Sequence, residues 1–127
     1  MNYLGMMDGT IDDSQISASS SYNSDSSGVC YHTHARLHKT GGTFAWCASS
    51  ASDSQWIEVD LLKMTHFTGL IIQGRYNSDQ FVTSFKVRSS MDGSEWLSIK
   101  TDSWDGMVNI TTTKKHLFLN SLISYAL

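Results

Sequence analysis

The stretch from Ser54 to Ile99 contains four candidate strands in succession, and this feature constrains the fold more than any other. Segments 54–61 and 81–90 alternate apolar and polar residues, which is the period of a strand with one buried face. Segment 68–75 is a short apolar run closed by a glycine, which predicts a strand buried on both faces. The predicted core consists of Ile57, Val59, Leu61, Leu70, Ile72, Phe81, Phe85, Val87, Leu97 and Ile99.

The strongest turn signal lies between segments 81–90 and 94–100. Asp92 and Gly93 form an Asp-Gly pair there, and glycine readily takes the positive φ that a tight turn needs. Strands joined this closely are antiparallel. We therefore predict an all-β protein with an antiparallel sandwich.

Strand signals outside this stretch are weaker. Ile16 and Ala18 share a parity and predict a short strand, and segments 107–112 and 116–119 are strand-like but have little else to anchor them. With 127 residues, the chain has room for one domain and one core.

Composition and motifs exclude several functional classes. The formal net charge of −3 argues against general nucleic-acid binding, which needs a basic face. No apolar run approaches the roughly 18 residues of a membrane helix, and residues 1–9 lack the apolar stretch of a secretory signal. The sequence contains no G-x-S-x-G elbow, phosphate-cradling glycine loop or H-E-x-x-H helix. We therefore predict a binding module with no catalytic activity and no cofactor.

The motifs DGTIDDSQISASS, ARLH, AWC, QWIEVDL, QGR and FVTSFKVRSSMDGSEW follow one another in this order. This order resembles a discoidin domain, also called the coagulation factor V/VIII type C domain, over roughly Leu4 to Ile99. The resemblance implies a distorted jelly-roll β-sandwich with ligand-binding loops clustered at one end. Family members bind anionic phospholipid, collagen or glycans, so the resemblance does not imply one ligand.

Beyond Ile99 the resemblance weakens. The family normally continues with a proline-containing turn and two further strands, but this sequence contains no proline. Either the final strands are missing or segment 117–127 replaces them. We expect a single discoidin-like domain over residues 1–127 that is truncated at its C-terminal side. Such a domain belongs to an extracellular protein, as a piece of a secreted or membrane-anchored parent or as a protein exported by another route.

The sequence contains two cysteines, Cys30 and Cys47, in a serine-rich, extracellular-looking context that suggests an oxidising compartment. They are the only available partners for each other, although in relatives a cysteine at the position of Cys47 can pair with one in the C-terminal strands. A bond would stabilise the fold by roughly 3 kcal/mol on the loop-entropy model. The alternative is two free thiols.

Two groups of side chains suggest metal ligands, but we expect no metal. Thiolate and imidazole are the ligands that zinc prefers. On an extended segment, alternate residues lie on one face, and this pattern places four such side chains together: Cys30, His32, His34 and His38. Ligands two residues apart on a strand diverge too far for a tight tetrahedral site. Carboxylates that suit calcium occur at Asp8, Asp12 and Asp13, where a solvated acidic turn is the simpler interpretation.

The candidate ligand loops are three polar segments bounded by strand signals. They cover residues 22–28, the region around Gly41 and Gly42, and residues 75–81. The resemblance implies that the three are neighbours in space. The candidate ligand-binding residues are Tyr22, Asn23, Asp25, Tyr31, His34, Arg36, Thr43, Tyr76, Asn77 and Asp79.

Loop chemistry ranks the partners. Tyrosine rings and polar side chains suit a glycan or glycoprotein, which we predict as the partner. Anionic phospholipid ranks second, because the tips of the first and third loops lack an apolar wedge. Collagen ranks lower. Collagen-binding relatives use a tryptophan in the first loop and acidic residues in the second and third loops, whereas the matching positions here look like Tyr22, His38 and Gln80. The loop end contains His32, His34 and His38, whose ordinary pKa is roughly 6.5. Acidification would therefore make this end cationic and favour binding to anionic lipid.

Overall fold

The computed structural model describes residues 4–22, 30–36, 45–50, 52, 54–75, 82–103 and 107–125, with the backbone alone for 83–84, 99–103, 107–112 and 119–125. Five strands form one antiparallel sheet in the order β1-β2-β5-β3-β4. Within the described residues, no helix has the length and apolarity needed to cross a membrane. The elements are η1 (Asp13–Gln15), β1 (Ile16–Ala18), η2 (His32–His34), β2 (Gln55–Ile71), β3 (Val82–Ser90), β4 (Leu97–Ser103) and β5 (Met107–Tyr125).

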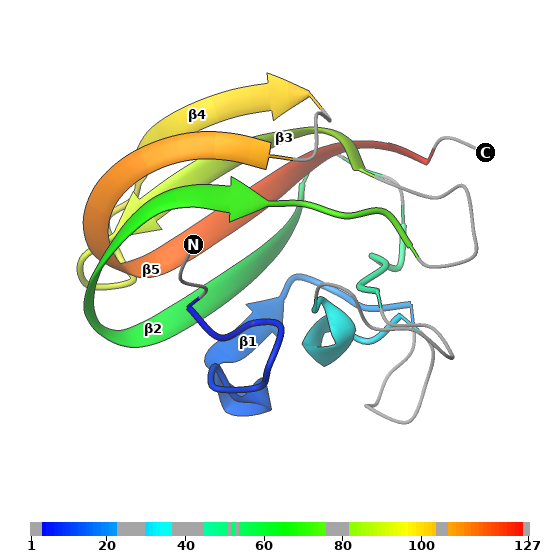
Figure 1. Cartoon of the computed structure of the whole chain (residues 1–127). Coiled ribbons are helices and arrows are strands. Elements are labelled where there is room, and N and C mark those ends of the chain that lie inside the picture. Colours follow the sequence, from blue (N-terminus) through cyan, green and yellow to red (C-terminus); the bar gives the residue numbers. More distant parts are fainter. Residues whose placement is uncertain are drawn as a thin grey trace.

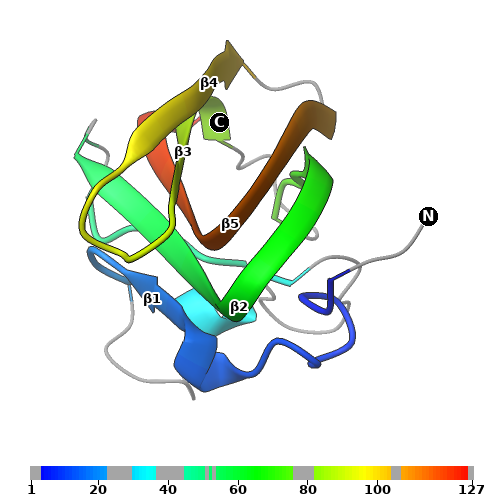
Figure 2. The same ribbon diagram turned by 90° about the vertical axis from the view of Figure 1, so that its left-hand side faces the viewer.

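The sheet forms two layers because its two long strands turn back together. β2 and β5 pair from one end to the other, and both bend at the left of Figure 1; from the side each has the shape of a V (Figure 2). The register of the pair shifts between Asp60 and Thr65, where Leu62 has a φ of 65°. The all-β antiparallel prediction is confirmed. The prediction of two separate strands here is wrong, because β2 is one strand that pairs with β5 on both sides of the turn.

The core lies between the two layers. Phe85 and Val87 of β3 are completely buried, as predicted, and Phe67 reaches them from the second half of β2. This contact is how the folded-back half of the sheet shields the first half from water. The cluster is completed by half-buried Leu61, Leu70, Ile72, Val82 and Leu117.

Three details of the predicted core differ from the structure. Leu97 is 63% exposed, because it begins the edge strand β4 and a register shift after Val87 breaks the alternation on which its prediction depended. The segment around Leu70 is half-buried rather than buried on both faces, because its layer contains only two strands. Ile57 and Val59 are also half-buried. The side chains of Phe81 and Ile99 lie outside the described residues.

The C-terminal segment occupies the centre of the sheet. The sequence predicts two strand-like pieces with weak anchoring, but β5 is one strand that pairs with β2 on one side and β3 on the other. A central strand has both edges hydrogen-bonded, which local residue patterns do not reveal. The prediction of weak anchoring is therefore wrong.

The predicted β3–β4 hairpin is confirmed, and its turn is fixed by Asp92. The Asp92 carboxylate accepts hydrogen bonds from the backbone N–H groups of Ser94 (2.8 Å) and Glu95 (3.0 Å) and from the Ser90 hydroxyl (3.0 Å). The Glu95 and Ser94 donors, followed by Ser90, lower the pKa of Asp92 to about 2. Gly93 has a φ of 79°, and a Cβ there would lie 3.3 Å from the His116 ring.

Phe85 provides a direct test of the core. Replacement of Phe85 by alanine is expected to lower the free energy of unfolding by about 3–5 kcal/mol, because it leaves a cavity between the layers. Thermal and urea unfolding followed by circular dichroism measure the change. Met91→Ala, at an exposed position, is the matched control and should be nearly neutral. Equal stability of the two variants would contradict this assignment of the core.

Candidate functional site

The disulfide between Cys30 and Cys47 organises the candidate ligand end. The two residues are bonded, with their Cα atoms 4.8 Å apart, so the possible disulfide is confirmed. The Cys47 N–H donates to the Cys30 carbonyl (3.1 Å), and the Tyr22 N–H donates to the Cys47 carbonyl (2.8 Å). Trp46 Nε1 donates to the Ser20 carbonyl (2.8 Å). The start of the first loop and both described flanks of the second loop are thus held together.

A small polar and aromatic group surrounds this crosslink. Tyr22 is 68% exposed, and its neighbour Ser21 contacts His32 twice: its Oγ lies 3.2 Å from His32 Nδ1 and accepts from the His32 N–H at 3.2 Å. The Tyr31 ring centroid lies 4.1 Å from that of His32 and 6.4 Å from that of His34. The structure therefore groups the flank that carries Tyr22 with the predicted residues Tyr31 and His34. The ligand-binding residues predicted from the sequence did not include Ser21 or His32, whose contact with each other is made only in the folded chain.

The zinc hypothesis loses its two premises. Segment 32–34 is a 3₁₀ turn and not an extended strand, so the shared parity of the histidines does not place them on one face. Cys30 is in a disulfide and supplies no thiolate. Among the described residues, no three His, Cys, Asp or Glu side chains are grouped to hold a metal ion.

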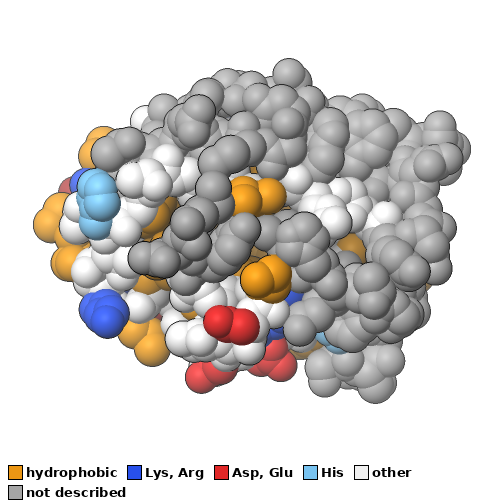
Figure 3. Space-filling model, viewed as in Figure 1, with side chains coloured by type: hydrophobic (Ala, Val, Ile, Leu, Met, Phe, Trp, Pro, Cys, Tyr) orange, Lys and Arg blue, Asp and Glu red, His pale blue; other side chains and the backbone are white. Residues whose placement is uncertain are grey.

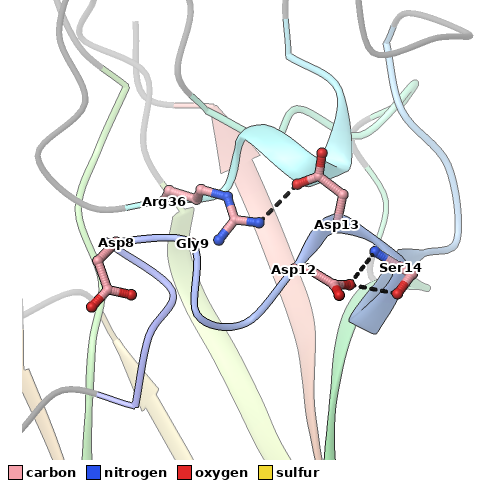
Figure 4. Close-up of a pocket in the computed structure, with 6 residues that line it drawn as sticks. All are labelled: Asp8, Gly9, Asp12, Asp13, Ser14 and Arg36. Atoms are coloured by element: carbon pink, nitrogen blue, oxygen red, sulfur yellow. Dashed lines mark hydrogen bonds and ion pairs between the residues drawn. The ribbon is translucent and has the colours of Figure 1, made fainter.

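The contacts that Arg36 makes with the N-terminal segment are structural. Its side chain is only 10% exposed, and Nη1 donates to the carbonyls of Met6 (2.8 Å) and Ile11 (2.8 Å). Nη2 pairs with the Asp13 carboxylate at 2.8 Å (Figure 4). Because these bonds occupy much of the guanidinium, the contact of Arg36 with a ligand stays a prediction.

The acidic residues beside Arg36 serve their own loop. Asp12 caps η1 by accepting from the Ser14 N–H and hydroxyl, and the Ser14 hydroxyl is the largest influence that lowers the pKa of Asp12. Asp8 accepts from the Thr10 N–H at 2.9 Å. The open hollow shown in Figure 4 has a volume of about 610 Å³ and is lined by Asp8, Gly9, Asp12, Asp13, Ser14 and Arg36.

The loop tips themselves lie outside the described residues. This applies to the predicted ligand residues Asn23, Asp25, Thr43, Tyr76, Asn77 and Asp79, and to His38 and Gln80. The described flanks bring the first and second loops together, and the role of the tips stays a prediction.

Comparison with known proteins identifies the family. The family model for the F5/8 type C domain matches residues 15–124. The chain belongs to this family. Mouse lactadherin is 39% identical over 123 residues, which cover 91% of this chain and 27% of lactadherin. Human coagulation factor V is 33% identical over 129 residues, which cover 95% of this chain and 6% of that protein. The chain therefore spans about a quarter of lactadherin and a small fraction of factor V.

Solved structures share the F5/8 type C fold at low sequence identity. Discoidin II of Dictyostelium discoideum has a TM-score of 0.67 at 20% identity, over 87% of this chain and 49% of that one. CpGH89CBM32-5 of Clostridium perfringens, in complex with GalNAc-β-1,3-galactose, has a TM-score of 0.69 at 17% identity, over 84% and 82%. The F5/8 type C chain thus has the discoidin β-sandwich fold and is a non-catalytic binding domain.

The disulfide makes stability depend on redox conditions. Reduction is expected to lower the free energy of unfolding by about 3 kcal/mol, because the bond closes a loop between residues 17 apart. Melting curves with and without reductant measure the loss, and a peptide map of the non-reduced protein should show one linked pair. A Cys30→Ser/Cys47→Ser variant should be insensitive to reductant. Two alkylatable thiols in the folded, oxidised protein would contradict the bond.

His32 makes stability depend on pH. Burial is the largest influence and lowers the pKa of His32, Asp13 raises it and His34 lowers it. Below the ordinary value of 6.5, the unfolded chain therefore binds more protons than the folded chain. The free energy of unfolding should fall as the pH falls below 6.5, and above it His32 should have no effect.

Melting temperatures between about pH 7.5 and about pH 5 test this dependence. The variant His32→Gln keeps a polar side chain that does not titrate, so it should show a smaller fall than the wild type. Identical slopes for the two proteins would refute the role of His32. The lowered pKa also means that His32 becomes charged at a lower pH than its ordinary value predicts.

Proposed function

We propose that this domain is an extracellular adhesion module that binds a glycan or glycoprotein at the loop end. The observation that carries the proposal is the exposed Tyr22 ring beside the disulfide, next to the Tyr31, His32 and His34 group. A sugar ring stacks on an aromatic face, while hydroxyl and imidazole groups hydrogen-bond to its hydroxyls. The exposed ring and the fixed polar groups supply both kinds of contact.

The position of Tyr22 is fixed before a ligand arrives. Its backbone N–H bonds to Cys47, and the adjacent Ser21 bonds to His32. A residue whose backbone is held in place loses less conformational entropy on binding, so a weak sugar contact retains more of its interaction energy.

The same end is less suited to a membrane. Of the large hydrophobic side chains that are exposed among the described residues, Tyr22 alone belongs to the flanks of the first two loops, and those flanks contain no lysine. Binding to an anionic bilayer favours aliphatic wedges with cations around them. The described part of this end therefore matches a sugar better than a lipid.

Two further observations support the proposal. The family 32 module from the NanJ protein of C. perfringens, solved in complex with galactose, has the same fold with a TM-score of 0.66 at 15% identity. Sugar recognition is thus compatible with this sandwich. The disulfide supports an extracellular location, because such bonds persist in oxidising compartments.

A glycan array followed by titration calorimetry tests the proposal. Galactose and GalNAc-β-1,3-galactose are the first probes, and the array extends the search. Tyr22→Ala is expected to lower the affinity for the best glycan about tenfold, because the stacking face is lost. Tyr22→Phe keeps the ring and should retain most of the affinity.

Two comparisons complete the experiment. Leu4→Gln, at an exposed residue of the N-terminal segment, should bind glycan as the wild type does. Phosphatidylserine vesicles are assayed in parallel. An empty glycan array together with vesicle binding that Tyr22→Ala abolishes would replace the glycan by anionic lipid at this end.

A further inference from the structure

The sequence contains one acceptor signal for N-linked glycosylation, and it lies near the start of β5. Asn109, Ile110 and Thr111 form an Asn-x-Thr triplet whose middle residue is not proline. Every other asparagine lacks a serine or threonine two residues later, which applies to Asn2, Asn23, Asn77 and Asn120. The chain therefore offers a single acceptor asparagine.

The triplet coincides with an irregularity in the pairing of β5 with β2. Phe67 of β2 pairs with Thr112. Gly69 pairs with Asn109, so β5 has one residue more than β2 between these two pairs. Such an extra residue stays outside the regular hydrogen-bond ladder and locally disrupts it. Gly69, directly opposite Asn109, is exposed and has no side chain. The backbone therefore leaves room at position 109 for a large substituent.

Asn109 also lies on an open edge of the sheet. β3 pairs with β5 only between His116 and Tyr125. Among the described residues, no strand pairs with β5 before His116 on the side away from β2. An unpaired edge is a template for pairing with another chain, and proteins protect such edges with charged side chains or proline. Segment 107–113 contains neither.

The turn that begins this two-stranded layer adds exposed apolar surface. Leu62 and Met64 of β2 are 63% and 47% exposed. Figure 3 shows hydrophobic side chains at the surface at the left end of the molecule, where β2 and β5 turn back. Unpaired backbone in a layer that also exposes apolar side chains favours association between copies. A bulky polar group at position 109 opposes that association.

We propose that Asn109 carries an N-linked glycan that covers the open edge of β5. In the transfer, the Asn109 amide nitrogen bonds to the anomeric carbon of an oligosaccharide carried on a polyprenyl pyrophosphate. The bond from that carbon to the pyrophosphate oxygen breaks, the lipid pyrophosphate leaves, and the amide gives up one proton. Thr111 supplies the hydroxyl that the acceptor signal requires.

This modification rests on the extracellular location proposed above, because the lipid-linked donor acts on chains that enter the secretory pathway. It does not depend on glycan binding at the loop end. The N-glycan is part of the protein, whereas the proposed ligand is a separate molecule.

Expression in mammalian cells behind a cleavable secretion signal tests the site. Treatment with peptide N-glycosidase should shift the wild type to faster electrophoretic migration, and mass spectrometry should locate the resulting aspartate at position 109. Asn109→Gln and Thr111→Ala should lose this shift, because each destroys the acceptor signal. Thr111→Ser keeps the hydroxyl and should keep the shift. Asn2→Gln, at an asparagine outside the signal, is the matched control.

Light scattering at equal protein concentration tests the covering role. Asn109→Gln and Thr111→Ala should form more oligomer than the wild type and Thr111→Ser, because their β5 edge is bare. Asn109→Gln should keep the wild-type glycan-array profile, so failure of the modification and failure of the proposed binding give different results. A wild type that loses its secretion signal but carries no N-glycan, a shift that persists in Asn109→Gln, or equal association of all the proteins would overturn the proposal.

Discussion

The pairing of β2 with β5 on both sides of their common bend is the constraint on which the rest of the structure depends. Both strands bend at the same place, and the bend brings Phe67 onto Phe85 and Val87. A flat pair of this length would expose its apolar face, and folding over removes that face from water. β3 and β4 then extend the sheet beyond β5, and β1 extends it beyond β2.

Irregular segments are tied to this framework by a few specific bonds. The disulfide joins two segments that have no strand of their own, and Arg36 holds the N-terminal loop through two carbonyls and one carboxylate. Such contacts replace the hydrogen bonds that a strand would obtain from its neighbours. They leave Tyr22 exposed on a segment whose backbone is fixed, which is the arrangement that a binding surface requires.

The two ends of the sandwich differ in chemistry because they are built differently. The loop end is formed by irregular segments around a crosslink, where tyrosine, serine and histidine side chains meet. The other end is formed by the turns of long strands, where lysine and aliphatic side chains project.

The sequence by itself determined the fold class, the buried face of β3 and the hairpin at Asp92 and Gly93, because alternation and turn chemistry are local properties. Tertiary structure decided that segments 54–61 and 68–75 form one strand, that β5 lies at the centre, and that Leu97 is exposed. Register shifts and strand order depend on partners far along the chain, and no local pattern encodes them. The disulfide and the grouping of Ser21 with His32 were decided in the same way, because only the folded chain fixes the distance between distant side chains.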